Sequence, residues 1–163
     1  GLRIAAAIAA VLIACVALIA LVYGILQYFG AYVGYGQFTL GRILGFLLSP
    51  VAWLLGVPWA DASTAGSLIG QKLILNEFVA YVAYSDVSAS MSPISQAIVI
   101  FALCGFANLS SIAILLGGLG ALAPSRRDDI SRLGVRALIA ATLANLMNAA
   151  LAGFFLSLPG AAG

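Results

Sequence analysis

The most informative feature of this sequence is how little charge it carries. Only 7% of its 163 residues are charged, histidine is absent, and 64% of the residues are hydrophobic. A water-soluble domain of this length needs a far more polar surface, so the composition excludes an ordinary soluble fold. The mean hydropathy of +1.16 indicates that most of the chain lies in a lipid bilayer, where the backbone must satisfy its own hydrogen bonds.

Basic residues and thiols are scarce as well, which excludes further classes. The net charge is only +2 and no basic block is interleaved with aromatic residues, so we expect no nucleic-acid partner. The two cysteines, Cys15 and Cys104, both lie in apolar segments, which favours two buried thiols over a disulfide or a metal site. We expect no metal ligand set and no cofactor. The apolar runs are too long for barrel strands, so the sequence predicts an all-α polytopic membrane protein.

Four apolar units, assigned to residues 1–36, 37–91, 92–123 and 124–163, follow one another along the chain. The first contains an apolar run over residues 4–29 that exceeds the length a bilayer core requires, which predicts a tilted transmembrane helix followed by a loop over residues 30–37. The fourth contains a predicted transmembrane helix over residues 133–158 that has no interruption. A polar stripe in this span is more typical of helix–helix contacts than of ligand binding. Its members are Thr142, Asn145 and Asn148.

The second unit contains two apolar pieces, residues 43–57 and 62–81, separated by a short polar connection. In this connection Pro58 cannot continue a helix, and Asp61 can cap the next one. The first piece is too short to cross a bilayer comfortably. Two interpretations follow. One is a re-entrant helical hairpin of the kind that lines transporter substrate sites, and the other is an ordinary span interrupted by proline and followed by a surface helix.

The third unit begins with Ser92-Pro93, an N-cap residue followed by proline at the first helical position, and continues as an apolar run over residues 94–122. Its middle, residues 105–111, reads Gly-Phe-Ala-Asn-Leu-Ser-Ser. Unwound backbone at membrane depth is tolerated only where it lines protein or water. We therefore predict a transmembrane helix that is interrupted at this segment.

Arginines determine the expected orientation. Arg126, Arg127, Arg132 and Arg136 surround the predicted short loop between the third and fourth units. By the positive-inside rule this loop is cytoplasmic, so the C-terminus lies outside. Counting back from this loop, Arg3 at the start of the first unit also lies on the cytoplasmic side only if the second unit crosses the membrane an even number of times. This consistency favours the re-entrant hairpin, with both of its ends outside.

Two charged residues, Lys72 and Glu77, lie clearly inside apolar sequence. Charges at membrane depth are costly, so both are functional candidates. Residues 62–81 are predicted to form one helix, on which the two side chains point about 140° apart around the axis, so each needs a separate partner. Lys72 then shares a face with Asn76. For Lys72 a structural link to a carbonyl or carboxylate and a functional role both remain open, whereas we interpret Glu77 as functional.

The surroundings of these charges resemble a known family. Residues 70–81 fit the pattern G-x-K-x-x-x-N-E-F-V-A-Y, which is typical of concentrative nucleoside transporters, and residues 104–112, Cys-Gly-Phe-Ala-Asn-Leu-Ser-Ser-Ile, resemble the second hallmark of that family. The two motifs occur in the expected order. The resemblance extends over the whole chain but corresponds only to the C-terminal part of a typical member. Because the chain also begins with Gly1 rather than methionine, we expect a part of a longer protein.

The resemblance implies a set of site residues. The family holds the ribose of a nucleoside with a glutamate of its second hairpin and with an asparagine and a serine of its later interrupted helix, which correspond to Glu77, Asn108 and Ser111. Asn76 and Phe106, from the same two motifs, are further substrate-binding candidates. Lys72 is a candidate for a structural or gating role. The base-reading hairpin and the site of the coupling cation belong to the preceding part of the family's chain.

The resemblance also implies the activity of the whole protein. We expect a nucleoside symporter coupled to Na+ or H+, working by alternating access as a homotrimer in the plasma membrane, which in bacteria is the inner membrane. The first helix would belong to the scaffold and the trimer contact. The alternatives are a channel or structural membrane subunit, and an intramembrane enzyme. An enzyme would require a nucleophile with a base, and this chain has no histidine and one clear intramembrane carboxylate.

Overall fold

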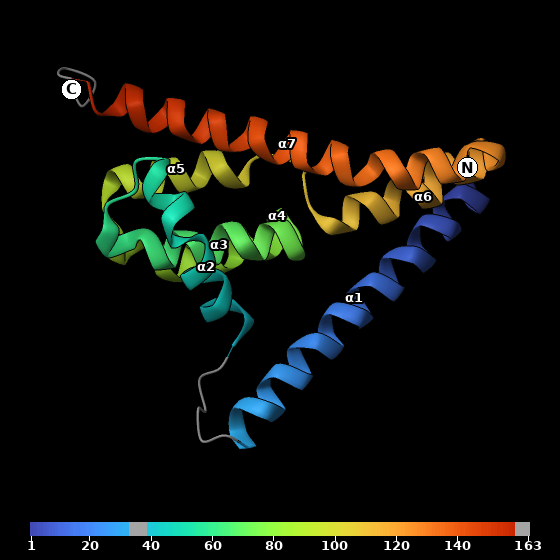
Figure 1. Ribbon diagram of the computed structural model, residues 1–163, viewed down its shortest axis with the longest axis horizontal. Coiled ribbons are helices and arrows are strands. Elements are labelled where there is room, and N and C mark those ends of the chain that lie inside the picture. The colour runs from blue at the N-terminus through green and yellow to red at the C-terminus, as the bar shows by residue number, and fades with distance from the viewer. Residues whose placement is uncertain (33–38, 159–163) are drawn as a thin grey trace.

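The computed structural model describes residues 1–32 and 39–158, and every regular element in these ranges is a helix (Figure 1). This confirms the all-α prediction. Of the predicted loop over residues 30–37, the first three residues instead continue a helix, and the others lie outside the described residues, as does the side chain of Cys15. The elements are α1 (Leu2–Tyr32), α2 (Leu40–Leu54), α3 (Trp59–Ile74), α4 (Glu77–Val87), η1 (Ser88–Ser90), α5 (Pro93–Leu103), α6 (Leu109–Leu122), η2 (Pro124–Arg126) and α7 (Arg127–Leu156).

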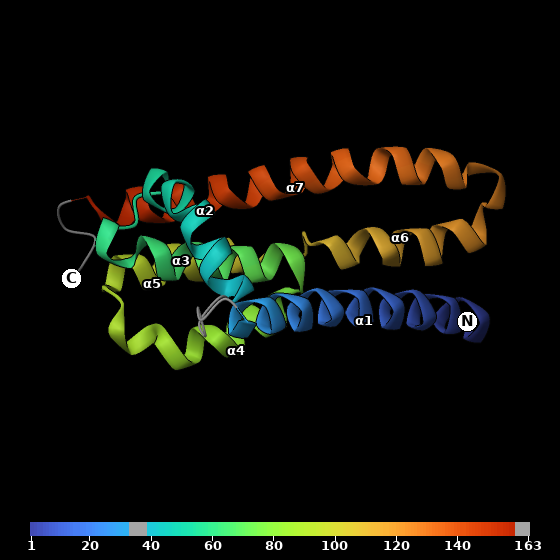
Figure 2. The ribbon, with the colours of Figure 1, turned by 60° about the horizontal axis from the view of Figure 1, so that its bottom comes forward.

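One long helix organises the others. α7 runs along the length of the molecule, and α5 and α6 follow it one after the other (Figures 1 and 2). α2, α3 and α4 gather near α5, whereas α1 packs against α6 and then diverges from α7 (Figure 1). The buried core lies among α2, α3, α5 and the C-terminal half of α7. Its members include Leu68, Ile69, Ile98, Leu103 and Ala149.

Small residues allow α2 and α3 to pack closely. A Cβ atom added to Gly66 would lie 2.9 Å from the backbone oxygen of Gly45 and 2.9 Å from the backbone nitrogen of Ser49, so the two helix backbones are nearly in contact. Such contacts are typical of helix packing in membranes. The two helices are bent by 116° relative to each other, which is compatible with a broken span and with a re-entrant loop. The hairpin therefore stays a prediction.

Asp61 connects the start of α3 to the start of α5. Its Oδ2 accepts hydrogen bonds from the backbone N–H of Ser92 at 3.0 Å, the hydroxyl of Ser92 at 2.8 Å and the hydroxyl of Ser95 at 2.6 Å. Ser92 caps α5 as predicted. The prediction that Asp61 caps the following helix is wrong, because α3 already begins at Trp59 and Asp61 lies in its first turn.

The arginine-rich segment is mostly helical rather than a loop. After α6, the short element η2 makes the turn, and Arg132 and Arg136 already lie on α7. Asp129 forms exposed ion pairs with Arg126 at 2.6 Å and with Arg132 at 3.3 Å. Most of the predicted fourth span, residues 133–158, is therefore part of a longer helix. The cytoplasmic location of the arginines stays a prediction.

α1, with 31 residues, covers the predicted helix over residues 4–29, and one stretch among the helices whose side chains are all described can cross a membrane alone. The stretch Pro124–Leu156 is long and apolar enough, and the bent pair α2–α3 adds a second candidate if it forms a single span. α5 and α6, with 11 and 14 residues, are too short to do so individually. Large apolar side chains on α1 and α7, such as Leu18 and Leu143, are exposed. Surfaces of this kind face lipid or further protein.

Candidate functional site

The first element of the site is a helix start within the charged motif. After α3, Leu75 adopts φ −93° and ψ −94°, and Asn76 caps α4 by accepting a hydrogen bond from the backbone N–H of Val79 at 2.9 Å. Asparagine is among the best N-cap residues. The predicted single helix over residues 62–81 is therefore wrong. The angular separation inferred from it is also wrong, because Glu77 starts a new helix.

The second element is the start of α6, which has a complete capping box. Residues 104–108 lie outside both α5 and α6, which overlaps the predicted interruption over residues 105–111 only in part, because residues 109–111 already belong to α6. Asn108 Oδ1 accepts from the backbone N–H of Ser111 at 2.9 Å, and Ser111 Oγ accepts from the backbone N–H of Asn108 at 3.1 Å. These bonds satisfy two backbone donors that a helix start leaves open. The side chains of the motif therefore rigidify the break.

Glu77 and Asn108 join the two helix starts. Asn108 Nδ2 donates to Glu77 Oε2 at 3.0 Å, and nearby the hydroxyl of Ser110 donates to the backbone oxygen of Leu75 at 3.2 Å. Asn108 is fully buried, whereas Glu77 is half-buried. Glu77 is the first residue of α4, where the positive end of the helix dipole favours a carboxylate. The two hallmark motifs thus meet at one hydrogen-bonded cluster.

This cluster can offer acceptors to a ligand that presents hydroxyl groups. Of the two carboxylate oxygens of Glu77, only Oε2 accepts a hydrogen bond from another described residue, so Oε1 is open to a ligand. Hydrogen bonds to an ionised carboxylate are roughly twice as strong as neutral ones. The half-buried hydroxyl of Ser111 already donates to the backbone oxygen of Asn108 at 2.8 Å and accepts from the backbone N–H of Asn108 at 3.1 Å, which leaves it one acceptor lone pair. This chemistry suits the neighbouring hydroxyls of a sugar.

The other predicted residues take different positions. The side-chain oxygen of Asn76 is used in capping α4. Phe106 lies in the break between α5 and α6, and 62% of its surface is exposed. Lys72 is 1% exposed and does not form a hydrogen bond to Glu77 in the described structure. With its amide oxygen facing both donors, Asn145 on α7 accepts from Lys72 Nζ at 3.0 Å and from the backbone N–H of Gly105 at 2.9 Å.

Sequence reasoning missed Asn145 as a residue of this region and misjudged Cys104. The only signal for Asn145 was its place in the polar stripe, which correctly indicated a helix–helix contact. Cys104 is exposed, and its Sγ lies 3.2 Å from the hydroxyl oxygen of Tyr81. The prediction of a buried thiol is wrong, because Cys104 is the C-cap residue at the end of α5 and its side chain is exposed there.

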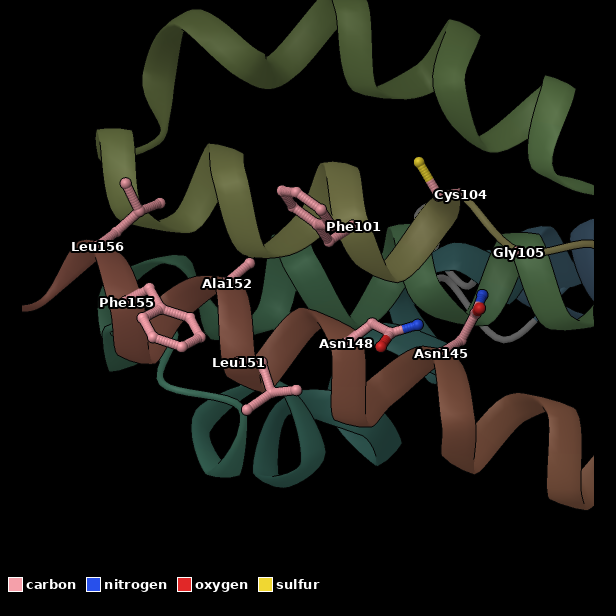
Figure 3. Close-up of a pocket in the computed structure, with 9 residues that line it drawn as sticks. All are labelled: Phe101, Cys104, Gly105, Asn145, Asn148, Leu151, Ala152, Phe155 and Leu156. Atoms are coloured by element: carbon pink, nitrogen blue, oxygen red, sulfur yellow. The ribbon is translucent and has the colours of Figure 1, made fainter. Parts of the chain in front are cut away.

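A cavity between α5 and α7 lies apart from the Glu77–Asn108 cluster (Figure 3). It has a volume of about 650 Å³, and none of Glu77, Asn108 and Ser111 lines it. Its polar groups are one thiol, from Cys104, and the amides of Asn145 and Asn148. The rest of its lining is mostly apolar. Because this cavity provides no charged group, we place the candidate site at the Glu77–Asn108 cluster.

Comparison with known proteins gives the family. The model of the family described as "Na+ dependent nucleoside transporter C-terminus" matches residues 1–153. Because this match covers nearly the whole chain, the chain belongs to that family. The two motifs that meet in the candidate site are those that suggested the resemblance.

Individual relatives support the same family. The chain is 56% identical to "Uncharacterized transporter YutK" of Bacillus subtilis (strain 168) over 96% of its length, and 45% identical to "Nucleoside permease NupC" of Helicobacter pylori (strain ATCC 700392 / 26695) over 97%. It covers 39% of each of these relatives. Among solved structures, it matches CNTnw in an inward-facing substrate-bound state with a TM-score of 0.80 and 52% identity, covering 97% of this chain and 39% of that one. A CNTnw variant in an outward-facing state matches with a TM-score of 0.85 and 51% identity, covering 95% and 40%. The chain therefore spans about two-fifths of the length of these proteins.

Proposed function

We propose that this chain is the ribose-binding C-terminal portion of a nucleoside symporter that is coupled to Na+ or H+ and imports nucleosides by alternating access. The observation that carries the proposal is the hydrogen bond between Glu77 and Asn108, which joins two helix starts in a member of this family. The family description supplies Na+ and nucleoside. The outward-facing and inward-facing structures of CNTnw support alternating access.

In this proposal the cluster binds ribose and carries out no covalent chemistry. Glu77 accepts hydrogen bonds from ribose hydroxyls, and Asn108 and Ser111 complete the polar contact. Asn76 and Phe106 line the same region, the first through its remaining amide donors and the second through its exposed ring. The base of the nucleoside and the coupling cation would bind mainly to the part of the protein that this chain does not contain.

We further propose an arrangement in the plasma membrane, which in bacteria is the inner membrane. α2 and α3 would form a re-entrant hairpin, and α5 and α6 would form one interrupted span, since neither is long enough alone. The arginines around η2 would be cytoplasmic and the C-terminus outside. The exposed apolar surface of α1 supports a scaffold role in a homotrimer, because such a surface requires lipid or protein to cover it.

Uptake by the full-length protein in liposomes tests the proposal. A symporter should show saturable nucleoside uptake that depends on an inward Na+ or H+ gradient. Nucleoside flux that does not saturate and ignores both gradients would indicate a channel. Recovery of a chemically altered nucleoside would indicate an enzyme, and an absence of any nucleoside flux in folded protein would refute a nucleoside transporter.

A further inference from the structure

Lys72 is buried without an acidic partner. It is 1% exposed and lies in the last turn of α3. Among residues 1–32 and 39–158, the ion pairs that form both involve Asp129 on the far end of α7, and no carboxylate pairs with Lys72. A cation near the end of a helix is favourable, but a buried ammonium still requires close hydrogen-bond acceptors. The acceptor that Lys72 uses therefore matters for the geometry of this region.

That acceptor is Asn145, and it is shared. In the amide orientation that its hydrogen-bond partners assign, one oxygen accepts both from Lys72 Nζ at 3.0 Å and from the backbone N–H of Gly105 at 2.9 Å. The Asn145 side chain points from α7 toward Gly105, as Figure 3 shows. A Cβ atom added to Gly105 would lie 2.0 Å from both terminal atoms of the amide, so only glycine leaves room for it. α3, α7 and the break between α5 and α6 therefore meet at one oxygen atom.

We propose that Lys72 and Asn145 are positioning residues that hold the break at residues 104–108, and with it Asn108, in the geometry that binds ribose. The inference rests on the proposed function, and neither residue touches the substrate in it. Gly105 is three positions from Asn108, so fixing its backbone N–H restricts where the start of α6 can lie. If the link is lost, the break populates other geometries, and the apparent affinity falls with the fraction that remains competent.

Two substitutions on α7 of the full-length protein isolate the link. Asn145→Leu keeps the approximate size of the side chain but removes the acceptor. Asn148→Leu makes the same change about one turn further along α7, where the amide is exposed and lines the same cavity, and it serves as the matched control. Asn145→Asp retains an oxygen for both donors and serves as the conservative variant.

Hydrogen exchange of the peptide that contains residues 104–108, followed by mass spectrometry, reports the link without any ligand. In Asn145→Leu the Gly105 N–H loses its acceptor, so exchange should accelerate by about 10-fold or more, and nucleoside affinity should weaken by a similar factor. Asn148→Leu and Asn145→Asp should resemble the wild type in both measurements. Equal exchange and equal affinity in Asn145→Leu and Asn148→Leu would overturn the proposal.

A double variant separates positioning from general stability. Adding Lys72→Met to Asn145→Leu removes the unpaired buried ammonium, so the thermal unfolding midpoint should recover, while the exchange rate stays high and the affinity stays weak. Recovery of the affinity together with the midpoint would show a merely structural role and overturn the proposal. If the wild type binds no nucleoside, the proposed function fails, whereas the exchange comparison still decides whether Asn145 holds the break.

Discussion

Replacing Glu77 by glutamine tests the candidate site most directly. Glu77 Oε2 accepts from Asn108, and the other carboxylate oxygen is open to a ligand. Glutamine has nearly the same shape, and its single oxygen can still accept from Asn108. It then presents an NH2 group where the carboxylate presents an oxygen. The substitution therefore preserves the internal contact and changes what a ribose hydroxyl meets.

The magnitude follows from the lost charge. A hydrogen bond to a charged group contributes about 1.5 to 3 kcal/mol, so affinity for a nucleoside should weaken roughly 10- to 150-fold. The lost interaction of the carboxylate with the start of α4 should lower stability by only about 0.3 to 1 kcal/mol. A thermal unfolding measurement without ligand therefore separates the effect on binding from the effect on folding. Asp129→Asn, at an exposed carboxylate on α7, is the control that should leave affinity unchanged.

Equilibrium binding to the full-length protein gives the required comparison. A nucleoside and an analogue lacking one ribose hydroxyl are each titrated into the wild type and into Glu77→Gln. If Glu77 contacts that hydroxyl, the analogue loses affinity in the wild type but loses little more in the variant, and such non-additivity indicates direct contact. If the two losses simply add for each ribose hydroxyl, Glu77 acts at a distance and the site assignment is wrong.

Four further predictions concern the same architecture. Asn108→Ala should cost about 1 kcal/mol in the unfolding free energy through the lost cap, whereas Asn108→Ser should retain the cap and still weaken nucleoside binding. Gly66→Ala should destabilise by about 1 to 3 kcal/mol because its Cβ meets the α2 backbone, while Gly24→Ala, with nothing within 4 Å, should be tolerated in thermal unfolding. An impermeant thiol reagent should label Ser90→Cys from outside and Ser131→Cys only from the cytoplasm; the reverse pattern contradicts the orientation. The 163 residues alone in liposomes should not take up nucleoside, and ordinary uptake would show that they contain a complete site.

Local signals in the sequence determined the class of the protein and several helix boundaries. The scarcity of charge and the long apolar runs indicated an all-helical membrane chain. Ser92-Pro93 predicted the start of α5, and the glycine and amide of the segment over residues 105–111 predicted non-helical backbone before α6, although the two hydroxyls of that segment lie within α6. These predictions succeeded because capping and hydropathy act among residues a few positions apart. The two hallmark motifs likewise identified the family before any geometry was known.

Only the tertiary structure decided which side chains meet. Glu77 and Asn108 are 31 positions apart, and Lys72 reaches an amide on a different helix. Residues 62–81 are apolar enough to predict one helix, but α3 ends early because Asn76 caps α4 and Ser110 bonds to the unwound backbone at Leu75. Sequence periodicity identifies contacts when one face of a helix is apolar and the other polar. Helices that are apolar on nearly all sides lack that signal, so the partners of their few polar groups follow from packing alone.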